Sequence, residues 1–212
     1  MRPLLLGHRG ARASRRIPEN TLASFELCLQ HGCDGFEFDV RRSGDGTAVV
    51  CHDAAIRGLT VGDAAAEVLA LPRLDDVLAR FSLRAFLDIE LKVAGLEAQV
   101  IAALREGAPS KGYVVSSFLP EALRAVHRLD PGIPLGFLFD QRDQVPPPDL
   151  PIAWLIPHFE VADQRMIEGA HASGIKVMTW TVNGAEGIRQ FAEWGVDAII
   201  SDETELLVRS TR

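Results

Sequence analysis

The stretch Gly35-Phe36-Glu37-Phe38-Asp39-Val40 alternates apolar and acidic side chains, and Phe86-Leu87-Asp88-Ile89-Glu90-Leu91 repeats this pattern later in the chain. A period of two is typical of β-strands, because successive side chains point to opposite faces of the sheet. Short apolar runs of this kind alternate with longer helical patterns along the whole chain, which indicates βα units and a parallel sheet. We therefore predict an α/β fold, a (β/α)8 TIM barrel.

The eight predicted strands are Leu4–His8, Gly35–Val40, Phe86–Leu91, Tyr113–Phe118, Leu135–Phe139, Ala153–Ile156, Val177–Thr181 and Ala198–Ser201. Helical patterns between them cover Leu22–Gln30, Leu74–Phe81, Leu96–Arg105, Glu121–Leu129, Gln164–Ala172 and Glu186–Trp194. The connection Gln141–Pro151 holds four prolines. Because proline lacks the amide donor of a helix, we expect no normal helix there.

The composition is that of a globular protein, with 47% hydrophobic and 24% charged residues, and we expect one domain over residues 1–212. A net charge of -7 argues against nucleic acid and against stable membrane association. No apolar run suits a signal peptide or a membrane span. The cysteines Cys28, Cys33 and Cys51 fit neither a disulfide framework nor a zinc site, so we expect reduced thiols and a cytoplasmic location.

A further strand-like run, Thr47–His52, follows the second predicted strand too closely to be parallel to it. We expect it to form a short β-hairpin extension after that strand. Asp45-Gly46 is a favoured two-residue hairpin turn, in which both residues have φ > 0. This turn would place His52 directly opposite Asp39, at the mouth of the barrel.

Carboxylates gather where the barrel strands end, which is where the working groups of such barrels lie. Glu37 and Asp39 share one face of their strand, and Glu90 is expected beside them on the neighbouring strand. Three acids this close would repel one another unless a cation lies between them, and oxygen ligands suit Mg²⁺, Ca²⁺ or Mn²⁺ better than zinc. The alternative is that the acids are simply exposed to solvent. Asp88 lies one step deeper and is expected to be structural.

Two imidazoles accompany these acids: His8 ends the first predicted strand, and His52 is brought in by the hairpin. With Arg9 and Lys92 nearby, this set suits in-line displacement at phosphorus. One histidine would take a proton from the nucleophile, the other would protonate the leaving oxygen, and the cations would stabilise the equatorial charge.

With these residues identified, the chain resembles the glycerophosphodiester phosphodiesterase family over most of its length. The shared motifs are His8-Arg9-Gly10, Pro18–Phe25, Gly35–Val40, Asp45-Gly46 with His52-Asp53, and Ile89–Lys92, with weaker matches at Ser116–Phe118, Thr179–Asn183 and Ile199–Asp202. The resemblance implies that His8 and His52 are the acid–base pair. It implies Glu37, Asp39 and Glu90 as ligands of one divalent cation, and Arg9 and Lys92 as phosphate contacts.

The resemblance also implies that Glu19 orients Arg9 or the substrate, and that Phe118 and Trp180 line the substrate pocket. Asn20 is expected to be the N-cap of the first helix. The segment Ala54–Thr60 departs from the family pattern because it is short and altered. We therefore expect a reduced cap insertion and an open mouth that accepts varied alcohols.

The implied activity is metal-dependent hydrolysis of a small-molecule glycerophosphodiester to an alcohol and glycerol 3-phosphate. Attack by the substrate's own 2-hydroxyl would give a cyclic phosphate first, because an intramolecular nucleophile has a high effective concentration. His8 is the candidate base and His52 the candidate acid, with the reverse assignment left open. The alternatives are a lipid phosphodiesterase of the lysophospholipase D or sphingomyelinase D type, and a non-catalytic phosphate-binding barrel. The sequence does not decide the preferred alcohol, the metal or the oligomeric state.

Overall fold

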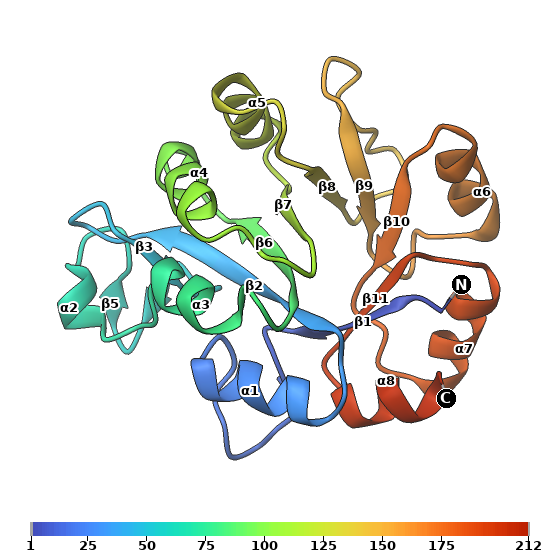
Figure 1. The fold of residues 1–212 in the computed structure, drawn as a ribbon, viewed down its shortest axis with the longest axis horizontal. Coiled ribbons are helices and arrows are strands. Elements are labelled where there is room, and N and C mark those ends of the chain that lie inside the picture. The colour runs from blue at the N-terminus through green and yellow to red at the C-terminus, as the bar shows by residue number, and fades with distance from the viewer. Residues whose placement is uncertain (1, 212) are drawn as a thin grey trace.

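The computed structural model describes residues 2–211, and its centre is a closed barrel of parallel strands (Figure 1). Each strand pairs with its neighbour in the order β1-β2-β6-β7-β8-β9-β10-β11, and β11 pairs with β1 to close the ring. The prediction of a (β/α)8 barrel is confirmed. The barrel strands are β1 (Leu4–His8), β2 (Gly35–Arg42), β6 (Phe86–Leu91), β7 (Tyr113–Ser117), β8 (Leu135–Phe139), β9 (Ile152–Pro157), β10 (Lys176–Thr179) and β11 (Ala198–Ser201).

Helices surround the barrel on its outer side (Figure 1). They are α1 (Leu22–Gln30), α3 (Leu74–Phe81), α4 (Glu97–Glu106), α5 (Pro120–Leu129), α6 (Gln164–Ala172), α7 (Ala185–Glu193) and α8 (Thr204–Ser210). The six predicted helices are confirmed to within one residue at each end, whereas α8 was not predicted. The fully described segment Gln141–Pro151 contains no helix, as its prolines indicated.

Two apolar layers hold the barrel together. Outside the strands, the rings of Phe25 and Phe36 stack with centroids 4.2 Å apart, and Phe81 meets Phe36 edge-on at 5.2 Å. Inside the barrel, a separate buried cluster includes Leu6 and Met178. Burial of apolar side chains on both faces explains why the strands alternate so little between apolar and exposed polar residues. The acids and histidines above this inner cluster are therefore exceptions to the apolar interior of the barrel.

The hairpin after β2 has a different register from the one predicted. Strand β3 (Ala48–Val50) is antiparallel to β2, with Val40 opposite Val50. Ser43 N donates to Thr47 O at 3.0 Å across a loop of three residues, in which Gly46 has φ 86°. This is the three-residue hairpin with a left-handed glycine at its end. The predicted two-residue turn, with both Asp45 and Gly46 at φ > 0, is wrong.

Tertiary contacts account for this longer loop. A Cβ on Gly44 would lie 2.5 Å from Asp63 O, so the loop needs a glycine at the place where the two backbones touch. The Asp45 carboxylate accepts hydrogen bonds from Ser43 Oγ and Ala66 N, which fix the loop from two sides. As a consequence Cys51 N donates to Asp39 O at 3.0 Å, and Cys51 rather than His52 faces Asp39.

The residues that follow form a small lobe, which we define as residues 54–71. It contains the two-stranded hairpin of β4 (Ala55–Ile56) and β5 (Leu59–Thr60), and the short helix α2 (Ala66–Leu69). Its buried side chains Val61, Ala66 and Leu69 pack against Val49 and Cys51 in a cluster separate from the barrel core. The lobe lies beyond β3, to one side of the barrel (Figure 1).

Candidate active site

A cavity of about 170 Å³ opens where the barrel strands end, and we call it the inner cavity. Eight of the ten predicted site residues line it: His8, Arg9, Glu37, His52, Glu90, Lys92, Phe118 and Trp180. Leu138 and Ile200 complete the lining. Asp39 is buried next to it, and Glu19 lies behind Arg9. The structure thus brings the predicted residues to one place, although His52 arrives by another route than the predicted pairing with Asp39.

Strand register places the carboxylates. Glu37 pairs with His8 on one side and with Asp88 on the other, while Asp39 pairs with Glu90. Glu37, Asp39 and Glu90 each offer an oxygen within 4.8 Å of the others'. Of these, Glu37 Oε1, Asp39 Oδ1 and Glu90 Oε1 accept no hydrogen bond from any described residue. Buried anionic oxygens without donors are costly, so the donor set fits a bound hard cation.

The electrostatics of the cluster agree with this fit. Burial and the charges of Asp39 and Glu90 raise the pKa of Glu37 well above its usual range. Burial and the charge of Asp39 raise the pKa of Glu90 to about 7. A divalent cation would reverse this effect, because it favours the ionised carboxylates.

Asp88 belongs to the layer below, as predicted. It is fully buried, and Ser116 Oγ donates to its Oδ1 at 2.5 Å. Burial raises the pKa of Asp88 to about 7. This acid therefore stays apart from the three that share the cavity rim.

Two cations face the acids. Lys92 Nζ lies 2.7 Å from Glu90 Oε1, as an ion pair without hydrogen-bond angles, and 3.6 Å from Asp39 Oδ1. Arg9 Nε lies 3.2 Å from Asp39 Oδ2, and Arg9 Nη1 donates to Glu19 Oε1 at 2.8 Å. The Arg9 backbone is in the left-handed region, with φ 53°, and its N–H donates to Glu37 Oε2 at 3.0 Å. Such strain is typical of positions fixed for a functional reason.

Both histidines have one ring nitrogen tethered to an aspartate. His8 Nδ1 lies 2.8 Å from Asp202 Oδ1, and His52 Nδ1 lies 2.8 Å from Asp53 Oδ1. A carboxylate partner keeps the proton on Nδ1 and leaves Nε2 free as an acceptor in the neutral ring. The His8 side chain is only 11% exposed and that of His52 is 33% exposed, so His8 lies deep and His52 at the rim. Burial lowers the pKa of His8, against the opposing effect of the Asp202 hydrogen bond.

Asp202 and Asn183 were not predicted as site residues. Asn183 Nδ2 donates to Asp202 Oδ2 at 2.7 Å, and Asp202 N donates to Asn183 Oδ1 at 2.9 Å. Desolvation of Asp202 is outweighed by hydrogen bonds from His8 and Asn183, which lower its pKa to about 2. The only signal in the sequence was that both residues end the weaker motifs Thr179–Asn183 and Ile199–Asp202.

Asn20 also has a role that the sequence did not predict. Its side chain donates to Asp39 Oδ2 at 2.8 Å, and its backbone φ is 56°. Thr21 is the N-cap of α1, since its Oγ1 accepts from Ser24 N at 3.1 Å. The expected N-cap role of Asn20 is therefore wrong, and Asn20 instead fixes one of the clustered carboxylates.

Aromatic side chains form another part of the cavity wall. The rings of Phe118 and Trp180 meet edge-on with centroids 5.6 Å apart, and Lys92 Nζ lies 5.7 Å from the Phe118 ring centre. Trp180 Nε1 donates to Ile156 O at 3.0 Å, which fixes the indole. The inner cavity thus has one charged side and one apolar side.

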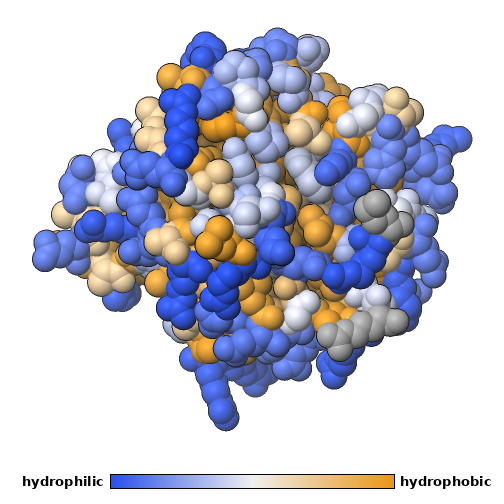
Figure 2. Space-filling model, in the orientation of Figure 1, coloured by the Kyte–Doolittle hydropathy of each residue, from blue (hydrophilic) through white to orange (hydrophobic). Residues whose placement is uncertain are grey.

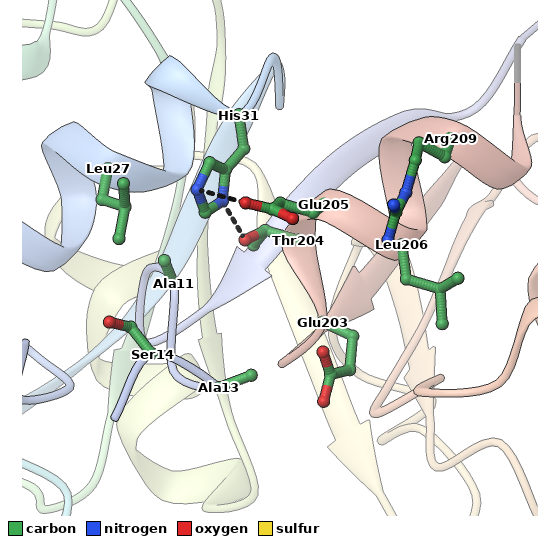
Figure 3. Close-up of a pocket in the computed structure, with 10 residues that line it drawn as sticks. All are labelled: Ala11, Ala13, Ser14, Leu27, His31, Glu203, Thr204, Glu205, Leu206 and Arg209. Carbon is green, nitrogen blue, oxygen red and sulfur yellow. Dashed lines mark hydrogen bonds and ion pairs between the residues drawn. The ribbon is translucent and has the colours of Figure 1, made fainter. Parts of the chain in front are cut away.

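Another cavity lies elsewhere, between α1, α8 and the loop after β1 (Figure 3). His31 points into it, but Thr204 Oγ1 lies 2.7 Å from its Nδ1 and Glu205 Oε1 lies 3.3 Å from its Nε2 (Figure 3). Both ring nitrogens are occupied, and none of the clustered acids lines this cavity. It does not share the chemistry of the barrel mouth.

The surface gives no sign of a membrane span: among residues 2–211, no helix is long and apolar enough to cross a bilayer. On the face seen in Figure 2, apolar atoms form small patches between hydrophilic ones. The exposed large apolar side chains, including Val68, Leu83 and Val145, come from separate elements.

Comparison with known proteins relates the whole chain to one family. Residues 8–100 and 88–206 match the model of the "Glycerophosphoryl diester phosphodiesterase family". The glycerophosphodiester phosphodiesterase of Caldanaerobacter subterraneus is 29% identical, with 100% of this chain and 99% of that protein covered. The corresponding protein of Bacillus subtilis is 26% identical over 97% of this chain and 85% of its own length.

Solved structures of phosphodiesterases are also similar to this chain. A phosphodiesterase of Oleispira antarctica, in complex with the product sn-glycerol-3-phosphate, has a TM-score of 0.84 and 28% identity over 99% of this chain and 96% of its own. The glycerophosphodiester phosphodiesterase of Thermotoga maritima has a TM-score of 0.82 and 25% identity over 99% and 98%.

Proposed function

The chain belongs to the glycerophosphoryl diester phosphodiesterase family, and from this premise we propose that it hydrolyses glycerophosphodiesters to an alcohol and glycerol 3-phosphate. Family membership makes it a phosphodiesterase, as predicted. The observation that carries the proposal is that two aspartate-tethered imidazoles, Lys92 and Arg9 face one cavity beside the carboxylate cluster. A phosphate-binding barrel without activity would have no use for two such histidines.

Glu37, Asp39 and Glu90 would hold one divalent cation, Mg²⁺, Ca²⁺ or Mn²⁺, through their oxygens that lack donors. When bound, the cation would polarise a phosphoryl oxygen. Arg9 and Lys92 would bind the other phosphate oxygens, and their ion pairs with Asp39 and Glu90 keep them aimed at the cavity. Asn20 holds Asp39, and Glu19 holds Arg9.

For the reaction we infer attack by the substrate's 2-hydroxyl. His8 Nε2 accepts the hydroxyl proton as that oxygen bonds to phosphorus. His52, which enters this step as the imidazolium, donates its Nε2 proton to the oxygen of the departing alcohol as the bond from that oxygen to phosphorus breaks. Water then adds to the cyclic phosphate and opens the ring, with the two proton transfers reversed. Asp202 keeps the His8 proton on Nδ1 and stabilises the imidazolium. The depth of His8 and the rim position of His52 support this assignment over the reverse one.

The glycerol would lie in the inner cavity, with its carbon side against Phe118 and Trp180. This arrangement suits a small-molecule substrate. We also propose that residues 1–212 act as one domain, and that the protein works in the cytoplasm. The second point is supported by Cys28, Cys33 and Cys51, which are all unpaired thiols.

The test is release of glycerol 3-phosphate from glycerophosphocholine by the purified protein, with and without a chelator. His8→Ala and His52→Ala serve as variants, and a lysophospholipid serves as the competing substrate. We expect release that requires the divalent ion and both histidines. Turnover of the lysophospholipid alone would replace the proposal with the lipid phosphodiesterase, and no turnover of either would leave only the binding barrel.

A further inference from the structure

A second cavity, of about 450 Å³, lies next to the inner one, and we call it the outer cavity. Three segments enclose it: the loop 18–21 before α1, residues 50–53 at the end of β3, and the small lobe with Ile56, Arg57, Ala70 and Leu71, followed by Pro72. His52 is the one residue that lines both cavities. The imidazole proposed to protonate the leaving oxygen therefore stands on the boundary between them.

The two cavities share more than this side chain. Glu19 lines the outer cavity and accepts a hydrogen bond from Arg9, which lines the inner one. Asn20 lines the outer cavity and donates to Asp39. A phosphodiester whose phosphate contacts Arg9 and Lys92 would therefore have glycerol on one side of His52 and its second alcohol on the other.

We propose that the outer cavity is the binding site for the alcohol that leaves, and that it selects this alcohol by shape and apolar surface. The inference rests on the proposed function, because it needs the diester to be cleaved at the inner cavity. It changes the expectation of an open mouth, since the small lobe builds a wall against which the alcohol can pack.

The residues of the lining explain why apolar surface rather than charge would determine which alcohol binds. Pro18, Val50, Ile56, Leu71 and Pro72 contribute carbon atoms to the lining. An alcohol with a hydrocarbon part would bury this surface, whereas methanol would leave most of the cavity to water.

The charged side chains of the lining already make hydrogen bonds or ion pairs within the protein. Glu19 is paired with both Arg9 and Arg12. Asp53 is paired with His52, and the Arg57 guanidinium donates to Leu69 O. Each of these charged side chains thus already has a partner within the protein, whereas the carbon atoms of the lining are free to pack against a ligand.

The experiment compares two esters of glycerol 3-phosphate, one with methanol and one with butanol. Their leaving groups have similar basicity, so the chemical step is matched and only the outer cavity distinguishes them. Because each buried methylene contributes about 0.8 kcal/mol and the butyl ester has three more of them, we expect its kcat/KM to exceed that of the methyl ester by about 50-fold.

Ile56→Trp would fill the outer cavity and should remove this preference, measured as the ratio of kcat/KM for the butyl ester to kcat/KM for the methyl ester. Leu71→Trp tests the same point from another side of the cavity if the first variant folds poorly. Val68→Trp is the matched control: it adds the same ring to the same lobe, at a side chain that is 63% exposed and outside the lining. It should keep the wild-type preference.

The outcomes separate the two proposals. If neither ester is cleaved, the proposed function fails. If the wild-type protein cleaves both esters equally well, or if Ile56→Trp and Leu71→Trp keep the same preference as Val68→Trp, the outer cavity does not bind the leaving alcohol. A preference for the choline ester over butyl that Ile56→Trp leaves unchanged would also overturn the inference, since it would place recognition of the alcohol elsewhere.

Discussion

His8 and Asp202 lie 194 positions apart in the chain, and the barrel brings His8 Nδ1 to 2.8 Å from Asp202 Oδ1. Strand β1, which ends at His8, pairs with β11, which ends one residue before Asp202. Asn183 holds the other oxygen of the same carboxylate. The deeper of the two histidines therefore has its ring orientation and its tautomer fixed by the residue that follows the last barrel strand.

Asp202→Asn should lower kcat by about 10²-fold or more with little change in KM. Asn183 Nδ2 needs an acceptor at its side of residue 202, so the new amide would turn its NH2 toward His8 Nδ1. The His8 proton would then move to Nε2, the nitrogen that must be unprotonated to accept the hydroxyl proton. Nitrogen-15 NMR of the His8 ring checks the tautomer directly.

The control for this variant is Asp197→Asn. His171 Nε2 lies 2.8 Å from Asp197 Oδ2, which is a similar pair outside both the inner and outer cavities. It should leave kcat unchanged. If Asp202→Asn also kept full activity with an unchanged His8 spectrum, Asp202 would have no part in positioning the base.

Glu37→Gln and Glu90→Gln should each weaken binding of a divalent cation, measured by isothermal titration calorimetry with Mg²⁺, Ca²⁺ and Mn²⁺ in turn. Each substitution replaces a charged oxygen of the cluster with a neutral amide. Asp88→Asn is the matched control, because Asp88 is an acid of the same strand as Glu90 but bonds to Ser116 instead. Equal affinity in all four proteins would exclude the cluster as the cation site.

In the presence of a chelator, the free energy of unfolding should fall as the pH rises from 4.5 to about 7. The folded protein retains protons on Glu90 and Asp88 at pH values where the unfolded chain has released them, so stability decreases with rising pH in this window. Thermal unfolding at the two ends of the window measures this. A saturating divalent ion should raise Tm most at the upper end, and a Tm that rises with pH in chelator would contradict the shifted acids.

A substrate without the 2-hydroxyl, a propanediol phosphodiester, tests the cyclic route. We expect turnover to fall by on the order of 10³-fold, because the intramolecular nucleophile is gone. His8→Ala should add little to that loss, because the hydroxyl from which His8 takes a proton is missing. His52→Ala should still slow the reaction. Equal rates with the two substrates would mean that water attacks the diester directly.

Much of the site was predictable because strands have a period of two. That rule alone placed Glu37 and Asp39 on one face of β2. The expectation that β6 lies next to β2 and parallel to it then placed Glu90 beside them. The register of the hairpin was not predictable, because it depends on Gly44 touching Asp63 O and on Asp45 bonding to Ala66 N. Neither contact has a local signal.

The positioning residues were missed for a related reason. Asn20 looked like a helix cap because a cap is the usual role of asparagine before a helix, and the bond to Asp39 becomes visible only in three dimensions. Asp202 and Asn183 act on His8 from the opposite end of the chain. Pairing between residues so far apart cannot be read from spacing.

Closure of the ring between β1 and β11 also has a consequence for biosynthesis. The ribosome makes His8 long before Asp202, and β1 has no partner on its β11 side until β11 has emerged. A nascent chain can bring the three carboxylates of β2 and β6 together early, yet the base remains without its aspartate. We therefore expect this enzyme to become competent only after β11 and Asp202 have been made.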